Sequence, residues 1–328
     1  MQGGSKTNEQ THTMTRPLLA VACALASAAL TAQSTLYVKP GASGDGTSWE
    51  TPAGLHAALA KAPAGASLWV AQGTYRTSDS GNRAAAFVVP SGVSVFGGFR
   101  GGETDVSERR PSQHPTTLSG EIGTPERVDN AYTVVRLTDA DGSTVLDGLT
   151  IAHAYANGAG PVADPRRAGG GLLVDLSRAN AKANPLIRDC VFEDNYARDG
   201  GAVYIDGAGG RATPTFVDCR FRENEADLDG GAVYNDGRRH GEASPIFRDC
   251  VFAANEANYG AAVFNQATKG TASPRLSDCR FADNRAYVRG TTVYSIDHQG
   301  ESTPVLNDCV FDDGNAPADA VGTFARSN

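Results

Sequence analysis

The sequence predicts an all-β fold, a right-handed parallel β-helix solenoid with a short N-terminal capping helix. One phrase, first read as Pro185 to Ala197, is written five times between residues 184 and 315. Cysteines mark its period of 29 to 31 residues, at Cys190, Cys219, Cys250, Cys279 and Cys309. A fixed period near 30 residues indicates stacked supersecondary units, each of which buries its apolar face only against its neighbours.

The repeated unit is composed of strands. Its apolar runs are three to five residues long, rich in Val, Phe and Tyr, and separated by Gly, Asn, Asp and Pro. Two helices per repeat would need unbroken stretches of about ten residues or more. A second phrase, which begins as Gly200-Gly-Ala-Val-Tyr204, alternates with the first. We therefore expect about three short strands per coil, with coils stacked at roughly 4.8 Å.

We divide the chain into three parts, a signal peptide, an N-terminal strand with the capping helix, and the β-helix, which cover residues 1–32, 33–85 and 86–328. The regular coils of the β-helix are expected over residues 169–316. Arg16 precedes an apolar run from Pro17 to Ala32 that ends in small residues, which is the layout of a secretory signal. The run is too short to span a membrane. We expect a bacterial protein that is secreted or displayed on the cell surface, with no transmembrane segment in its mature chain.

The N-terminal elements follow in order. Leu36 to Pro40 is expected to be the first strand. Thr51 is expected as the N-cap and Pro52 as the first residue of a helix within residues 53–62. Because the open end of a β-helix exposes strand edges, we expect this helix to cover it. Further strands are expected at residues 67–71, 86–89, 93–96, 116–119, 133–137 and 144–151.

Charge limits the choice of partners. Without residues 1–32, the chain has 27 basic and 36 acidic residues, a formal net charge of −9. This negative balance argues against nucleic acid or an anionic membrane as a partner. We expect a monomer whose partner is a polysaccharide or a cell-surface protein.

The motifs resemble two groups of proteins. The paired phrases Gly-Gly-Ala-Val and Phe-x-x-Asn resemble the repeats of chlamydial-type polymorphic outer membrane proteins. Leu68 to Tyr75 and Gly97 to Thr104 resemble segments of bacterial secreted proteins with a pectate-lyase-like β-helix. The resemblance covers nearly all of the mature chain and implies the fold. It implies no single activity, because this superfamily includes lyases, hydrolases and adhesins. We expect no autotransport, because the family's translocating barrel has no counterpart here.

Several columns of residues recur once per coil. Asparagines occupy one position in four consecutive coils, at Asn195, Asn224, Asn255 and Asn284. Stacked amides bond their own coil and the next one, so we predict an internal Asn ladder. The five cysteines are expected to be buried apolar thiols, with disulfides as the alternative. Aspartates recur at 189, 218, 249, 278 and 308. We expect each to bond backbone N–H groups or an arginine; calcium bridging is the alternative to no cofactor.

A fourth column is aromatic, at Tyr204, Tyr234, Phe264 and Tyr294. If these side chains point outward, they form a strip suited to sugar rings or to protein. If they point inward, they belong to the core. Alternation with the inward Val203 favours the first orientation and a corner would reverse it, so both stay open.

Catalysis would require residues that do not recur. About eleven extra residues lie between Asn157 and Ala168, and long loops on a rigid scaffold often carry function. Beside this loop the sequence offers one cluster of reactive side chains, His153, Tyr155, Asp164, Arg166 and Arg167. The main hypothesis is a non-catalytic β-helix for recognition, adhesion or structure. The alternative is a polysaccharide lyase or glycoside hydrolase, acting on an acidic or neutral polysaccharide, that uses this cluster.

The signal peptide gives the first testable prediction. Because the apolar run ends in small residues and the fold begins near Leu36, the mature N-terminus should lie between Ala29 and Ser34. N-terminal sequencing of the exported protein checks this. Acylation at Cys23 would show instead that the chain is a lipoprotein.

Overall fold

The computed structural model describes residues 1–4, 34–289, 292–312 and 321–326. From Ser34 onward, the described residues belong to one compact unit, Gln33–Asn328. Nearly all of the expected signal peptide lies outside the described residues.

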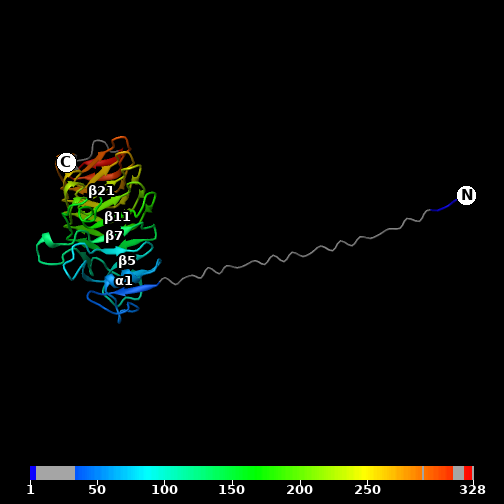
Figure 1. Cartoon of the computed structure of the whole chain (residues 1–328), viewed down its shortest axis with the longest axis horizontal. Helices are drawn as coiled ribbons and strands as arrows, with labels where there is room; N and C mark the ends of the chain where they lie inside the picture. The colour runs from blue at the N-terminus through cyan, green and yellow to red at the C-terminus, as the bar shows by residue number, and fades with distance from the viewer. Residues whose placement is uncertain (5–33, 290–291, 313–320, 327–328) are drawn as a thin grey trace. The chain divides into compact units, whose positions relative to one another are not determined.

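From Thr35 onward, the chain winds into a solenoid whose strands pair in parallel from coil to coil. In Figure 1, β7, β11 and β21 stack in order along it. The largest sheet contains β1 (Thr35–Val38), β2 (Ser67–Ala71), β3 (Gly73–Arg76), β5 (Ser94–Phe99), β6 (Thr116–Ser119), β8 (Val145–Asp147), β9 (Thr150–Ala152), β13 (Leu186–Arg188), β14 (Val191–Glu193), β18 (Thr215–Val217), β19 (Arg220–Arg222), β23 (Ile246–Arg248), β24 (Val251–Ala253), β27 (Arg275–Ser277), β28 (Arg280–Ala282), β31 (Val305–Phe311) and β32 (Val321–Arg326).

Three smaller sheets complete the coils. The second sheet contains β4 (Phe87–Val89), β7 (Val135–Thr138), β11 (Leu172–Asp175), β16 (Val203–Asp206), β21 (Val233–Asp236), β26 (Val263–Gln266) and β30 (Val293–Ile296). The third contains β10 (Tyr155–Ala156), β15 (Tyr196–Asp199), β20 (Glu225–Asp229), β25 (Glu256–Tyr259) and β29 (Arg285–Arg289). The fourth contains β12 (Lys182–Ala183), β17 (Arg211–Ala212) and β22 (Glu242–Ala243).

This architecture confirms the predicted parallel β-helix and corrects its details. The coil that begins at β13 has four main strands, where about three were expected, because a left-handed turn at Asp189 (φ 49°) separates β13 from β14. The strand predicted at 144–151 is likewise two strands, β8 and β9. β3 was not predicted.

The helix is present but begins later than predicted. α1 covers Leu55–Lys61, and its N-cap is Gly54, which makes no side-chain capping bond. The prediction of Thr51 as N-cap and Pro52 as first helical residue is wrong, because Ala53 forms a bridge with Val38 and holds this segment extended. Leu55 and Leu59 are buried and join the main core. The capping role of α1 stays a prediction.

The core consists of columns of identical or similar side chains. Phe192, Phe221, Phe252, Phe281 and Phe311 stack with ring centroids 4.6–5.0 Å apart, at the spacing of the coils. Beside them the five cysteines of the repeats are buried and free. Burial raises the pKa of the Cys190 thiol to about 12, so it remains protonated at neutral pH.

The four asparagines form a continuous hydrogen-bonded column. Asn224 donates from its side-chain amide to the carbonyl of Phe192 (3.0 Å) and to Oδ1 of Asn255 (2.9 Å). Oδ1 of Asn255 also accepts the backbone N–H of Asn224 (3.2 Å). The same pattern recurs at the neighbouring coils. Each amide therefore satisfies turn groups that strand pairing leaves unbonded.

A second, shorter ladder lies on the second sheet. The side chain of Asn235 donates to Asn265 Oδ1 (2.8 Å), and Asn265 donates to the Ser295 hydroxyl (3.1 Å). Asn235 and Asn265 are fully buried. The sequence analysis missed this ladder, although two inward polar residues in consecutive coils indicate it.

The Asn ladder gives a stability prediction. Asn255→Ala removes bonds to Asn224, Asn284 and the Phe221 carbonyl, and it leaves a buried N–H and a buried carbonyl unpaired. We expect a loss of roughly 1–3 kcal/mol in the free energy of unfolding. Asn284→Ala should cost less, because it removes three side-chain bonds, two from Asn255 and one to the Phe252 carbonyl, whereas Asn255→Ala removes four. Equal shifts in chemical denaturation would contradict this account.

Candidate functional site

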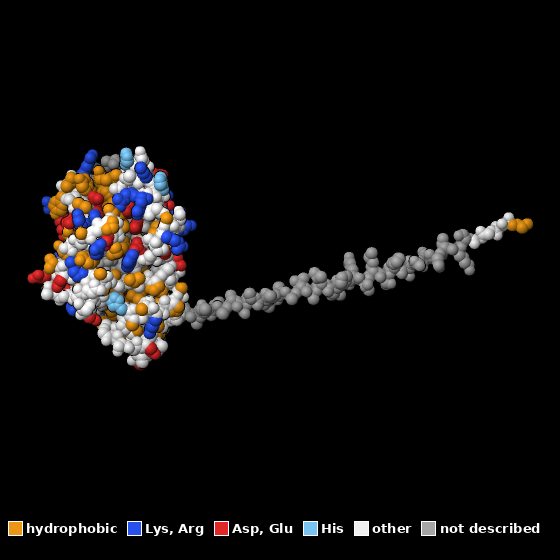
Figure 2. All heavy atoms as spheres, viewed as in Figure 1, with side chains coloured by type: hydrophobic (Ala, Val, Ile, Leu, Met, Phe, Trp, Pro, Cys, Tyr) orange, Lys and Arg blue, Asp and Glu red, His pale blue; other side chains and the backbone are white. Residues whose placement is uncertain are grey.

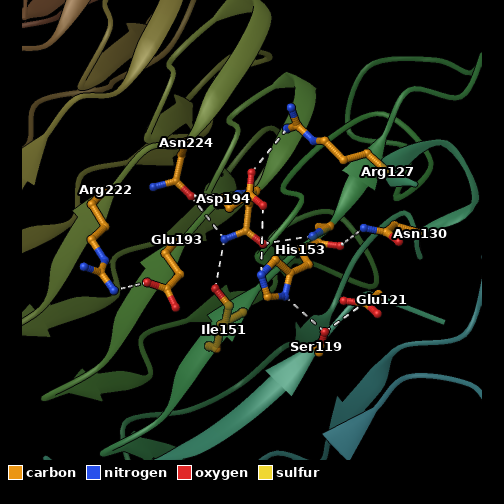
Figure 3. A network of polar contacts seen from close by, with 12 residues as sticks. Ser119, Glu121, Arg127, Asn130, Ile151, His153, Glu193, Asp194, Arg222 and Asn224 are labelled. Atoms are coloured by element: carbon orange, nitrogen blue, oxygen red, sulfur yellow. Dashed lines mark hydrogen bonds and ion pairs between the residues drawn. The ribbon is translucent and has the colours of Figure 1, made fainter. Parts of the chain in front are cut away.

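His153 belongs to a network of polar contacts, which Figure 3 shows in close-up. It lies between β9 and β10 in a left-handed conformation (φ 63°). Its Nδ1 is 3.3 Å from the Ser119 hydroxyl, and its Nε2 is 3.9 Å from Oδ2 of Asp194. The Asn130 side chain donates to the His153 carbonyl (2.8 Å) and fixes the turn. The imidazole therefore contacts a hydroxyl and lies near a carboxylate.

Arg127 closes one side of this network. η2 (Arg127–Asp129) carries its guanidinium to within 3.8 Å of Asp194 and 3.4 Å of Glu225. The same guanidinium lies over the rings of Tyr155 and Tyr196, 5.5 and 5.6 Å from their centroids. These two rings stack at 4.5 Å. The cation pairs with two carboxylates of adjacent coils, and one of them, Asp194, lies 3.9 Å from His153. General acid–base chemistry uses such a composition.

Ser119 is poorly placed for nucleophilic attack. Its side chain comes from β6, and the residue is only 2% exposed. Its hydroxyl also accepts the backbone N–H of Glu121 (3.1 Å). One lone pair is therefore engaged, and the oxygen faces away from solvent.

The inserted loop makes a different set of contacts. Arg166 forms a bidentate pair with Asp164, with bonds of 2.9 and 2.7 Å. Arg167 pairs with the buried Asp199 and also donates to the Gly160 carbonyl (3.3 Å). The arginines are held by carboxylates of their own loop and of β15, whereas His153 bonds to β6 and the β14–β15 turn. The predicted single cluster is thus separated into two sets of contacts.

The aromatic column does not form an exposed strip. Tyr204, Tyr234 and Phe264 are at most 3% exposed, and Tyr294 is partly buried. Their side chains point away from the main core, as alternation with Val203 indicates, but they join a second core with Leu173 and Ala168. Of the two alternatives that the sequence left open, the structure therefore favours packing of these rings over an exposed strip. Sequence periodicity gives the direction of a side chain and cannot show what packs over it.

Aspartates surround this second core. Tyr204 donates to Asp236 Oδ2 (2.7 Å), and Arg238 bonds both oxygens of the same carboxylate. Burial and the neighbouring Asp199 raise the pKa of Asp229 to about 7. Burial and the neighbouring Asp236 raise the pKa of Asp206 to about 6. Between pH 3.8 and their raised pKa values, these two carboxyls are therefore protonated in the folded chain and ionised in the unfolded chain.

A third feature is a groove on the outer face of the largest sheet. Trp69, Phe96, Asp147 and Arg188 occupy one register position in consecutive coils. Asp147 is fully buried and is shared by Arg109 and Arg188, with contacts of 2.5 and 2.7 Å. Figure 2 shows that acidic and basic side chains are interspersed on the face in view.

The structure offers no support for a calcium site. Among the described residues, no group of three or more His, Cys, Asp or Glu side chains is arranged to hold a metal ion. Asp189, Asp218, Asp249, Asp278 and Asp308 all adopt left-handed turn conformations, with φ from 49° to 55°.

Within the described part of the chain, no helix is long and apolar enough to cross a membrane.

The raised pKa values predict how stability depends on pH. Because Asp229 binds its proton more tightly in the folded state, the unfolding free energy should fall as pH rises from about 4 to about 7. Asp229→Asn should therefore raise the melting temperature more at pH 8 than at pH 5. Asp164→Asn is the matched control, because the Arg166 bond lowers the pKa of Asp164 below its usual value. Asp164 is therefore ionised in both the folded and the unfolded chain at pH 5 and at pH 8, and its replacement should shift the melting temperature equally at the two pH values. An equal shift at both pH values for Asp229→Asn would refute this account.

Comparisons with known proteins agree with this fold. A family model for the Chlamydia polymorphic membrane protein repeat matches residues 189–206. A pectin methylesterase from Aspergillus niger superposes with a TM-score of 0.50 and 16% identity, covering 89% of this chain and 84% of that one. Pectate lyase Pel9A gives 0.48 and 12%, covering 88% of this chain and 74% of that one. No curated protein matches the sequence. The chain is a parallel β-helix that shares its fold with the pectin methylesterase, and its residues 189–206 match the polymorphic membrane protein repeat.

Proposed function

We propose that the chain is a secreted or surface-displayed recognition module that binds a ligand without converting it. The observation that supports this proposal is that the recurrent asparagines and the loop arginines already have partners within the protein. The recurrent asparagines bond the coils to one another, and the arginines of the inserted loop are held by Asp164 and Asp199. A rigid surface that presents fixed side chains suits recognition. The match to a repeat of polymorphic membrane proteins supports placement outside the cell.

A second candidate function is a polysaccharide lyase or glycoside hydrolase. One observation favours it, because Arg127 pairs with both Asp194 and Glu225, and Asp194 lies 3.9 Å from His153. A carboxylate pair flanking a sugar bond is what a glycosidase requires, and a proton acceptor is what a lyase requires. The active residues would then be His153, Asp194 and Glu225, with Tyr155 and Tyr196 forming an adjacent aromatic surface.

A turnover assay separates the two functions. Mature protein with added calcium should release neither unsaturated uronates nor reducing ends from pectate, alginate, chondroitin or glucans. The same preparation, applied to a polysaccharide array, should retain a ligand. Product release that disappears in His153→Ala would establish the enzyme and overturn our proposal. Arg222→Gln is the control, because Arg222 pairs with Glu193 on the same sheet outside the contacts of His153.

A further inference from the structure

The inserted loop, residues 157–168, packs over the second core. Ala168 is fully buried in that core, and the partly buried Ala163 packs against it. The same core contains the ring of Tyr204, which is fully buried although it points away from the main core. The loop therefore closes an apolar compartment that lies outside the main core of the solenoid.

A few polar contacts hold the loop closed. The Arg167 guanidinium pairs with the Asp199 carboxylate on β15, and the two side chains are only 13% and 5% exposed. The Arg167 carbonyl accepts the backbone N–H groups of Arg198 and Asp199 at 2.9 and 3.2 Å. The Thr133 hydroxyl donates to the Pro165 carbonyl at 2.8 Å. Arg167 is therefore the charged anchor of the loop.

A second carboxylate lies beside this anchor. Asp229 on β20 is the register partner of Asp199, so the two carboxylates occupy equivalent positions on adjacent coils. Arg198 also acts on Asp199. The charged and titratable groups that face Asp229 come from the loop, β15, β21, the turn after β21 and β25: Arg167, Asp199, Tyr234, Arg238 and Tyr259.

The two cations that face Asp229 already have carboxylate partners. Arg167 pairs with Asp199, and Arg238 bonds both oxygens of Asp236. Among the described residues, no cation forms an ion pair with Asp229 itself. Burial and the neighbouring Asp199 raise the pKa of Asp229 to about 7, because its ionised form adds an uncompensated charge to a poorly hydrated space.

Opening of the loop relieves this charge. It admits water to the Asp199 and Asp229 carboxylates, and hydration lowers the cost of ionising Asp229. Opening also exposes the apolar second core, which opposes it at every pH. Ionisation of Asp229 therefore shifts the balance towards the open loop, while the cost of exposing the second core stays the same.

From these contacts we propose that the inserted loop is a proton-controlled cover of the second core, which stays closed while Asp229 carries a proton and opens when Asp229 is ionised. Opening of this one loop leaves the stacked columns of the main core in place, so it costs less than unfolding of the solenoid. The proposal is independent of the function proposed above, because a recognition module and an enzyme could carry the same cover.

The test is hydrogen exchange of the mature protein at pH 5 and pH 8, measured by mass spectrometry and divided by the intrinsic exchange rate at each pH. Amides of residues 167–169, Arg198 and Asp199 should open at least about tenfold more at pH 8 than at pH 5. The increase should reach about a hundredfold if opening returns the pKa of Asp229 from about 7 to 3.8. At both pH values these amides should exchange faster than residues 215–222 of the main core, because they exchange by local opening.

Two substitutions identify the titrating group. Asp229→Asn removes the carboxyl, so the opening of its loop should differ by less than about twofold between the two pH values. Asp206→Asn is the matched control, because burial also raises the pKa of Asp206, to about 6, beside the same core. Asp206 is the register partner of Asp236 and faces Arg239 rather than the loop anchor. This variant should keep the response of the wild type.

The wild-type comparison is decisive without any variant. A loop that opens equally at pH 5 and pH 8, or that exchanges only as fast as the main core, would overturn the cover. A response that persists in Asp229→Asn, or that disappears in Asp206→Asn, would overturn the role of Asp229. Circular dichroism at pH 5, where Asp229 is protonated, should show that both variants fold as the wild type does.

Discussion

Hydrogen bonding from one coil to the next is the interaction on which the rest of this structure depends. Strands and many turns satisfy it with backbone groups, whereas the turn after β14 also uses side chains. At the turn after β14, the amides of Asn195 to Asn284 replace the missing backbone partners and carry the bonding through the core. Stacked Phe rings on the same coils keep the identical spacing. Polar and apolar columns thus impose one register on all the sheets.

This constraint explains why the sequence predicts the fold so well. A residue needed in every coil, such as Phe192 or Asn195, appears in the sequence as a period, and its inward direction follows from strand alternation. Local irregularities are harder to predict. The left-handed turn at Asp189 divides a strand without interrupting the repeat, and the bridge between Ala53 and Val38 delays the start of α1. The bridge depends on a contact between residues distant in the sequence, which a local pattern does not contain.

The candidate sites were less accessible to prediction for a related reason. His153 was identified because it stands beside an insertion, but its contacts Ser119 and Asp194 come from the coils on either side of its own. Arg127 belongs to the network through Asp194. The orientation of Tyr204 and Tyr234 was left open, and their burial comes from a second core that the repeat pattern does not show. The groove residues Trp69, Phe96 and Arg188 have different identities in successive coils. Repetition therefore shows what the scaffold needs and hides what lies on its surface.

The number of regular coils can change without changing the surface of the earlier coils. Each coil contacts mainly its immediate neighbours, and the same Phe, Cys and Asn columns pass through coils such as those containing Cys219 and Cys250. One whole coil can in principle be lost or duplicated between them while every column stays continuous. The aromatic end of the groove lies in the earlier, irregular coils. Growth or shrinkage of the repeat array would alter how far that surface stands from the other end of the solenoid, and would leave the aromatic surface itself unchanged.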